Sequence, residues 1–320
     1  MRKFLRLFAL ILTVLVVIAG SVMGVLNGIN LTDLQINTMI ILGIICGASI
    51  LYCFIIGEIT GNTSQMDKLW SLLPIAYTWV VAIKGGFKTR LVIFACIVTL
   101  WGVRLTYNFA RKGAYKLKFW EGREDYRWAI LRSKKPLNNR FVWALFDLGF
   151  ISIYQNVLVL AITLPAVAVM ESTKSFGVID AIASLAAIFF LILELVADEN
   201  QWKFHQTKKK YLDNGLKLEE LPSPYNLGFN TTGIWGYMRH PNYLGEQGIW
   251  LSLYFFTVGA SVVGYGIFNW SIIGSLVLIL LFMGSSSFGE AISSSKYPKY
   301  LLYIDQVSKY LPIKKFDENK

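Results

Sequence analysis

"INTMIILGIICGASILYCFIIG" runs from Ile36 to Gly57 without a single charged side chain. A helix needs roughly 20 apolar residues to cross the hydrocarbon core of a bilayer, so this run predicts a transmembrane helix. It is one of about eight such runs, which give predicted spans at 4–26, 36–57, 69–83, 90–110, 141–169, 176–197, 243–260 and 265–286. The expected fold class is therefore all-α, a polytopic transmembrane helical bundle.

Composition agrees with this class. The chain has 320 residues, of which 55% are hydrophobic and 16% charged, and its mean hydropathy is +0.50. Soluble domains carry about 25% charged residues. The gaps between the runs are too short for an independent fold, so we expect one integral membrane domain over 1–320, with N-terminal helices in 1–60 and a core in 61–320. The first run follows Arg2 and Lys3 like a signal peptide, but it is longer than a signal sequence requires, and we expect a retained span.

The basic side chains gather in the predicted loops and indicate an orientation. Segment 111–140 carries ten Lys and Arg residues, 198–242 carries six and 290–320 carries six. Loops rich in Lys and Arg stay in the cytoplasm, so eight spans place the N-terminus and these segments there. The turn at 84–90 runs against this assignment, since it is basic and falls on the other side. We expect an integral protein of the bacterial inner membrane whose cytoplasmic loops form a cofactor pocket.

Several classes of site are not indicated. The net charge of +11 does not predict nucleic-acid binding, because the positive charge follows the membrane topology. Cys46, Cys53 and Cys96 lie in apolar runs and give neither a disulfide framework nor metal-ligand spacing. His205 and His240 are too few for a histidine metal site. We therefore expect no metal ion and no nucleic-acid partner.

"RHPNYLGE", Arg239 to Glu246, holds more polar groups than entry into a membrane requires. Pro241 suits the first turn of a helix, where its missing N–H costs nothing. Arg239 and His240 then stand just before a helix N-terminus, whose partial positive charge and free N–H groups favour an anion. Asn242 and Glu246 share one face of that helix, because they are four residues apart. The octapeptide therefore predicts a ligand site.

Two clusters nearer the N-terminus have two interpretations each. Glu58 and Asp67 belong to a polar loop, either as solvated and capping residues or as acids near a substrate cavity. Arg104, Tyr107 and Arg111 recur at helical spacing on one face. They are either a snorkelling stripe or a surface that binds phosphate.

A third cluster lies where a predicted span leaves the membrane. Glu194, Asp198 and Gln201 line one helix face, and Glu194 is inside the apolar run. A carboxylate at membrane depth needs a partner and often marks function. Both an interhelical ion pair and a functional site are consistent with this pattern.

Together these segments resemble one known family. "GIWGYMRHPNYLGE" is similar to the C-terminal signature of the steroid 5α-reductase-like membrane proteins, particularly their bacterial branch, DUF1295. "MDKLWSLLP", "LWGVRL", "EDYRW", "ELVADENQWKF" and "GEAISSSKYPKYLLYIDQVSKYLP" resemble further segments, so the resemblance covers most of the chain. It implies a helical membrane bundle that holds NADPH in a cytoplasm-facing pocket and transfers hydride to a carbon–carbon double bond conjugated to a carbonyl.

The resemblance also implies roles for individual residues. The expected cofactor-binding residues are Arg104, Arg111, Asp198, Gln201, Arg239, His240, Asn242, Tyr243, Glu246 and Glu290. Among them, Asn242 and Glu246 offer the donor and acceptor that a nicotinamide carboxamide needs. The catalytic acid is expected across the cofactor, at Glu58, Asp67 or Tyr107.

The substrate and the reaction class stay open. Glu58 follows Gly57 where characterised steroid reductases carry Gln-Glu, so the implied substrate is only lipid-soluble: sterol-like, polyprenyl or acyl. The "RHP-x-Y-x-G" core also occurs in isoprenylcysteine carboxyl methyltransferases, which bind S-adenosylmethionine and end in Glu-Glu, whereas Glu290 follows Gly289 here. An S-adenosylmethionine-dependent methyltransferase and a non-enzymatic lipid-binding protein are thus the alternatives to an NADPH-dependent oxidoreductase acting on CH–CH groups. Oligomeric state is not indicated.

Overall fold

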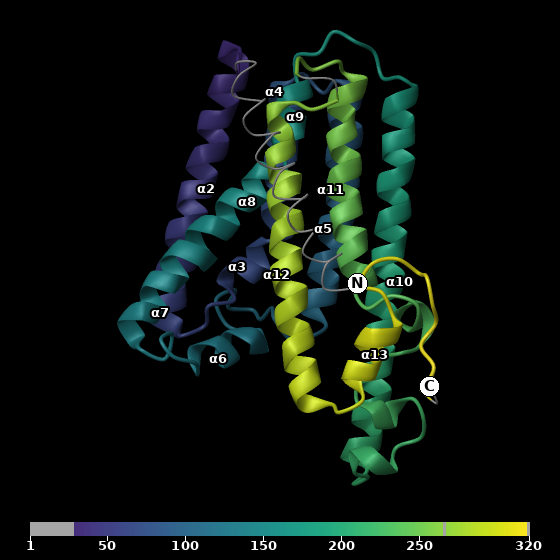
Figure 1. Cartoon of the computed structure of the whole chain (residues 1–320). Helices are drawn as coiled ribbons and strands as arrows, with labels where there is room; N and C mark the ends of the chain where they lie inside the picture. Colours follow the sequence, from purple (N-terminus) through teal and green to yellow (C-terminus); the bar gives the residue numbers. More distant parts are fainter. Residues whose placement is uncertain (1–28, 265–266, 319–320) are drawn as a thin grey trace. The chain divides into compact units, whose positions relative to one another are not determined.

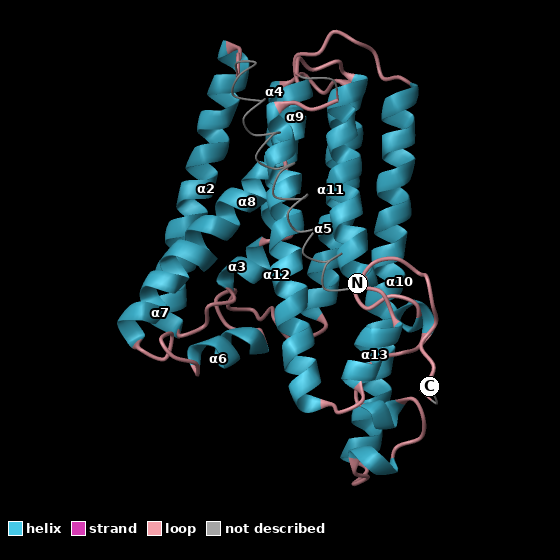
Figure 2. Ribbon diagram, viewed as in Figure 1, coloured by secondary structure: helices cyan, strands magenta, loops and turns pink. Residues whose placement is uncertain are grey.

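The computed structural model describes residues 29–264 and 267–318, and the predicted span 4–26 lies outside them (Figure 1). The described residues form helices and loops, with one isolated parallel bridge between Met238 and Ser308 (Figure 2). The α-helices are α2 (Asp33–Thr60), α3 (Gln65–Leu69), α4 (Leu72–Lys84), α5 (Thr89–Ala110), α6 (Tyr126–Arg132), α7 (Arg140–Phe146), α8 (Gln155–Ala161), α9 (Leu164–Val169), α10 (Val178–Asp213), α11 (Pro241–Gly259), α12 (Ile273–Lys296) and α13 (Tyr300–Gln306). A π-helix, η1 (Asp147–Tyr154), joins α7 to α8, and short 3₁₀ turns are η2 (Leu218–Glu220), η3 (Tyr225–Leu227), η4 (Gly233–Gly236) and η5 (Trp270–Ile272).

Five described segments are long and apolar enough to cross a membrane: Asp33–Thr60, Thr89–Ala110, Arg140–Val169, Val178–Asp213 and Trp270–Lys296. Each overlaps a predicted span. The predicted span 69–83 is the 13-residue helix α4, which is shorter than the roughly 20 residues of a full crossing. The predicted span 243–260 is the 19-residue helix α11, which is not among the five. The chain is an all-helical integral membrane protein with five candidate spans, and the number eight stays a prediction.

The chain divides into two compact units. Unit 1 comprises Met1–Ser184 and Leu251–Val277, and unit 2 comprises Leu185–Trp250 and Leu278–Lys320. The division passes through the continuous helices α10, α11 and α12 rather than between residues 60 and 61. The expectation of one integral membrane domain stays a prediction.

Helix α2 in unit 1 shows the pattern of a membrane helix, apolar outside and small or polar inside. Its buried positions recur every three or four residues and are Gln35, Thr38, Leu42, Cys46, Ser49, Cys53 and Gly57. Its exposed side chains include Ile36, Ile40, Ile44, Leu51, Ile55 and Ile59. Lipid does not penalise exposed isoleucine, while small and polar groups permit close packing and interhelical hydrogen bonds. One such bond joins Ser49 Oγ to Asn156 Oδ1 at 2.6 Å.

Arg90, one of the three basic residues in the turn that runs against the predicted orientation, is paired with an acid within unit 1. Arg90 and Asp180, at the start of α10, form a bidentate ion pair in which both N–O distances are 2.8 Å. Arg90 Nη1 also donates to the carbonyl of Lys174, and Ser172 Oγ donates to the carbonyl of Ala260. These contacts bring together the turns that follow α4, α9 and α11, three of the turns predicted for the non-cytoplasmic side.

The span Arg140–Val169 contains a widened helix with a buried acid. Phe146, Phe150 and Tyr154 stack along η1, with ring centroids 5.1 and 5.3 Å apart. Asp147 is only 1% exposed, and its Oδ1 accepts from Ser152 Oγ at 3.2 Å. A π-helix is rare and is frequently found at functional sites.

Unit 2 has an aromatic core of its own. Its buried members are Leu227, Phe229, Tyr300, Tyr303 and Val307, with Tyr297, Ile304 and Phe316 packed against them. The core therefore joins the loop before η4 to α13 and the residues that follow it. It fixes the loop that leads into the octapeptide.

Candidate functional site

The octapeptide has the predicted form, because α11 begins at Pro241. The two residues before it both reach Glu290 on α12. Arg239 Nε donates to Glu290 Oε1 at 2.8 Å, and His240 Nε2 lies 2.9 Å from the same oxygen. The Arg239 side chain is 3% exposed. Three expected cofactor-binding residues thus form one shielded charge cluster in unit 2.

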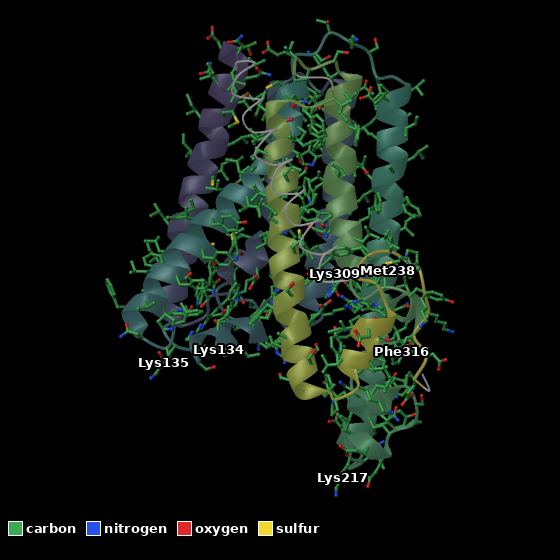
Figure 3. The ribbon with its side chains drawn as sticks, viewed as in Figure 1. Lys134, Lys135, Lys217, Met238, Lys309 and Phe316 are labelled. Atoms are coloured by element: carbon green, nitrogen blue, oxygen red, sulfur yellow. The ribbon has the colours of Figure 1, made fainter. Side chains whose placement is uncertain are left out.

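Arg239 also holds the last turn of α13 and the residues that follow it, 304–316, which we call the C-terminal segment. Arg239 N donates to Ser308 O and His240 N donates to Lys309 O, both at 3.1 Å. Arg239 Nη1 donates to the carbonyl oxygens of Ile304 and Val307. Figure 3 shows Met238 beside Lys309 at this pairing. Arg239 therefore holds the C-terminal segment, and its predicted role in binding the cofactor stays a prediction.

The first two turns of α11 carry the groups that call for a ligand. Asn242 Oδ1 is buried and has no hydrogen-bond partner in the described part of the chain. Glu246 is buried, and its Oε1 accepts from Trp250 Nε1 at 3.2 Å. The Tyr243 ring stacks on His240, with centroids 5.2 Å apart. A buried acceptor without a donor costs about 1–3 kcal/mol, so Asn242 is suited to an external donor.

Helix α10 packs closely on this end of α11 through glycine. A Cβ on Gly245 would lie 2.6 Å from Glu194 Cβ, and one on Gly248 would lie 2.3 Å from the ring of Phe190. Only glycine allows this approach. The predicted face of α10 therefore meets the octapeptide at Glu194.

The other two residues of that face follow along α10. Asp198 is buried. Gln201 Nε2 lies 3.1 Å from His205 Nε2, and Gln201 Oε1 is buried without a partner among the described residues. A second amide oxygen in unit 2 therefore lacks a donor.

His240 is suited to ordering the loop in its neutral form. Burial lowers its pKa below the ordinary value, although Glu290 acts in the opposite direction. At neutral pH the neutral imidazole donates one hydrogen bond to Glu290. This agrees with the expectation that His240 binds and orients rather than acts as the acid.

The arginine stripe expected on α5 lies in unit 1 and is not uniform. Arg104 is 8% exposed, whereas Tyr107 is 61% exposed. Arg111 follows the end of α5, donates to Asn108 Oδ1 at 2.7 Å and lies over the Tyr107 ring at 5.4 Å. Tyr107 and Arg111 thus pair at the helix end, and Arg104 lies deeper.

Asp67 belongs to a dense polar contact in unit 1 between α3 and the segment 119–128, which ends in α6. Trp128 Nε1 donates to Asp67 Oδ2 at 2.8 Å. The neighbouring Lys68 is fully buried and donates to the carbonyls of Phe119 and Glu121 at 2.8 and 2.7 Å. The "MDKLW" and "EDYRW" stretches are therefore parts of one structure.

Two carboxyl groups in this contact differ in acidity. Burial raises the pKa of Asp67, and the nearby carboxylate of Asp125 raises it further. Burial acts in the same direction on Asp125, but the guanidinium of Arg127, 2.9 Å away, holds the pKa of Asp125 below its usual range. Asp67 is thus the group suited to carry a proton.

Sequence reasoning missed several residues that the structure makes important. Lys68, next to Asp67, is not among the predicted site residues. Its signal is that a lysine in a short polar stretch between apolar helices needs hydrogen-bond partners. The backbone carbonyls of Ile304 and Val307, which accept from Arg239, could not be identified from the sequence, because a backbone group has no residue-type signature. Asp147 did leave one, since it is a lone acid inside the predicted span 141–169.

No group of His, Cys, Asp and Glu residues with metal-ligand geometry occurs among residues 29–264 and 267–318.

A profile described as "Protein of unknown function (DUF1295)" matches residues 53–307. An uncharacterized protein of Schizosaccharomyces pombe is 36% identical over 281 residues, which cover 82% of this chain and 78% of the yeast protein. No solved structure matches the chain. The profile spans the loops of unit 1 and the octapeptide of unit 2 alike, and the chain belongs to the DUF1295 family.

Proposed function

We propose that the protein is an NADPH-dependent reductase that transfers hydride to a conjugated carbon–carbon double bond of a lipid-soluble substrate. The buried Asn242 Oδ1, which has no donor in the described part of the chain, carries the proposal. A nicotinamide carboxamide offers an N–H donor for this oxygen. The second unpartnered oxygen, Gln201 Oε1, suits a hydroxyl such as that of a ribose.

The residues of unit 2 divide into binding and ordering groups. NADPH, when bound, supplies the hydride. Asn242 accepts from the carboxamide, and Glu246 lies one turn further on α11. Arg239, His240 and Glu290 order the loop before α11, since Glu290 compensates the charge of Arg239 and accepts a hydrogen bond from His240. The residues present therefore fit the carboxamide end, while Arg104 and Arg111 stay the proposed phosphate contacts.

The proton donor is proposed in unit 1, and Asp67 suits it best. Hydride addition to an enone leaves negative charge on the carbonyl oxygen, which needs a hydrogen bond or a proton. The raised pKa of Asp67 keeps a proton on its carboxyl group at higher pH than usual. Glu58 and Tyr107 are the other proposed donors.

One observation favours the methyltransferase alternative. Glu194, Asp198 and Glu246 are three buried carboxylates in unit 2. The sulfonium of S-adenosylmethionine is a cation, and buried acids suit a cation. The charge of the ligand that binds therefore separates the two functions.

Titration of the purified protein with NADPH and with S-adenosylmethionine tests the proposal. Fluorescence of the bound nicotinamide and isothermal titration calorimetry both measure binding without a substrate. Saturable NADPH binding that Asn242→Ala weakens is expected. Saturable binding of S-adenosylmethionine alone contradicts the reductase and supports the methyltransferase, and binding of neither compound contradicts both.

The proposed orientation places the loop between α5 and α7, and the loop between α10 and α11, in the cytoplasm. NADPH is a cytoplasmic molecule, so a cofactor site on that side agrees with the proposal. The basic residues of 111–140 support it through the positive-inside rule.

A further inference from the structure

Unit 1 contains a cavity that is lined by Glu58, one of the proposed proton donors, and by basic and aromatic side chains that the reductase proposal does not use. Its volume is about 230 Å³, and its lining includes Gly57, Glu58, Thr63, Arg132, Arg140 and Trp143. Sites for drug-sized ligands measure roughly 300–1,000 Å³, so this cavity fits a small polar group rather than a whole lipid-soluble substrate. The walls bring together acidic, basic and aromatic side chains.

The basic wall has an unused donor. Arg132 Nη2 donates to Thr63 Oγ1 and Glu124 Oε1, both at 2.8 Å, and its guanidinium lies 4.6 Å from the centre of the Trp143 ring. Arg132 Nε is buried without a hydrogen-bond partner among the described residues. This arginine is thus fixed in place with a free N–H, which suits a phosphate oxygen.

The acidic wall has unused acceptors. Glu58 is 26% exposed, and its closest cation, Arg140 Nη2, lies 3.6 Å away, beyond hydrogen-bond distance. Behind Gly57 lies Asp147, whose Oδ2 is buried without a partner in the described ranges. A Cβ on Gly57 would lie 3.3 Å from that oxygen, so only a glycine backbone separates the second acid from the cavity. The carboxyl group of Glu58 on the wall, with that of Asp147 behind Gly57, suits a cationic donor.

The cavity lies at the level where membrane spans end. Glu58 is in the last turn of the candidate span Asp33–Thr60, and Arg140 is the first residue of the candidate span Arg140–Val169. Trp143 is typical of the interface between hydrocarbon and headgroups. Lys134 and Lys135 lie exposed on the adjoining loop (Figure 3).

The helices whose ends line the cavity also carry exposed apolar side chains. Ile55 and Ile59 on α2 and Phe141 on α7 are exposed. Side chains of this kind at membrane depth face acyl chains. The cavity therefore offers polar groups suited to a lipid headgroup, and the same helices offer apolar side chains suited to acyl chains.

We propose that this cavity binds the headgroup of a zwitterionic phospholipid with a primary ammonium, the phosphoethanolamine group. The phosphate lies toward Arg132 and Arg140, and the ammonium lies toward Glu58 on the side of Asp147. The acyl chains lie outside, along α2 and α7. The inference goes beyond the proposed function, since it uses neither NADPH nor unit 2. It assigns Glu58, one of the three proposed proton donors, to lipid binding and leaves Asp67 and Tyr107 as the donors.

The carboxyl groups decide between lipid classes. A primary ammonium donates three hydrogen bonds, whereas a quaternary choline donates none. A glycerol headgroup carries no cation to offset the phosphate. The site should therefore prefer phosphatidylethanolamine to phosphatidylcholine and to phosphatidylglycerol, by about tenfold for one charge-assisted hydrogen bond.

Native mass spectrometry of the full-length protein in detergent tests the inference. The probes are dihexanoyl-phosphatidylethanolamine, the corresponding choline and glycerol lipids, and water-soluble glycerophosphoethanolamine. Wild type is expected to retain the ethanolamine lipid about tenfold better than the others, and Glu58→Gln is expected to reduce that preference to about one. Glu171→Gln, which removes an acid at the other end of unit 1, serves as the matched control and should keep the preference.

A second variant, at an exposed position, separates a loss of lipid binding from a folding defect. Arg140 is 86% exposed, so Arg140→Gln cannot disturb the core. It should weaken binding of all three phospholipids without changing their ranking. Equal retention of ethanolamine and choline lipids by wild type overturns the inference, and so does a loss of preference in Glu171→Gln. Equal affinity for glycerophosphoethanolamine overturns the assignment to a membrane lipid.

Discussion

Arg239 Nε lies 2.8 Å from Glu290 Oε1, although the two residues are 51 positions apart in the chain. The pair joins the start of α11 to α12 within unit 2. His240 shares the same oxygen, so one carboxylate binds two side chains of the octapeptide. This relationship makes Glu290 a determinant of how the predicted ligand site is shaped.

Glu290→Gln should lower the free energy of unfolding by about 3–5 kcal/mol, because it leaves the Arg239 guanidinium buried without an opposite charge. Thermal unfolding in detergent, followed by near-UV circular dichroism, measures the effect. Glu318→Gln is the matched control, since Glu318 pairs with Lys299 at 2.6 Å on the exposed surface. An exposed pair contributes about 0–1 kcal/mol. Equal shifts in the two variants would show that the Arg239–Glu290 pair is no more important than a surface pair.

Asn242→Ala should weaken NADPH binding by about 1–3 kcal/mol, because the carboxamide loses its buried acceptor. Fluorescence titration of NADPH measures the dissociation constant. The control is Asn214→Ala, which changes an exposed asparagine after α10 and should bind as wild type does. Wild-type affinity in a folded Asn242→Ala protein would remove Asn242 from the cofactor site.

Asp67→Asn should reduce turnover while NADPH affinity stays near normal. The pH profile gives the sharper test. The pKa of Asp67 is raised in the folded protein, so its proton is present below that pKa and is lost as pH rises through it. Turnover in wild type should therefore fall on the alkaline side, and stability should fall in the same direction, because the unfolded state carries the ordinary pKa. An unchanged alkaline limb in Asp67→Asn would assign the proton donor to another residue.

Cysteine labelling should place Lys134→Cys in the cytoplasm and Lys174→Cys on the opposite side. The candidate span Arg140–Val169 separates the two positions. A membrane-impermeant maleimide, applied to intact cells that express a variant without Cys46, Cys53 and Cys96, measures the sidedness. Reaction at Lys134→Cys alone would invert the orientation, and reaction at both positions would remove that span from the topology.

The sequence predicted those parts of the fold and site that depend on local pattern. Apolar runs predicted the five candidate spans, and Pro241 predicted the start of α11. Closely spaced polar residues identified the octapeptide. Contacts over long sequence distance were harder, because no local signal links Arg239 to the carbonyls of Ile304 and Val307. The Lys68 contacts with Phe119 and Glu121 are of the same kind, since backbone carbonyls occur at every position and carry no signature.

The division of Arg104 from Tyr107 shows a second limit. Helical spacing predicts a shared face, but the depth of each side chain depends on which neighbours pack there. Arg104 is deeply buried while Tyr107, less than one turn away, is mostly exposed. The spacing therefore predicted on which side of the helix the two residues lie, but it did not predict how deeply each side chain is buried.

The Arg90–Asp180 pair has a consequence for how the chain enters the membrane. In the predicted orientation, the turn after α4 crosses the bilayer before the ribosome has made α10. Arg90 must therefore be translocated with its charge unpaired, and it meets Asp180 only after the start of α10 has reached the same side. Once the pair has formed, moving either helix back into the bilayer would separate it and carry an unpaired charge into hydrocarbon, which is costly. We therefore expect the Arg90–Asp180 ion pair to help keep α5 and α10 inserted once the chain has folded, in addition to stabilising the folded state.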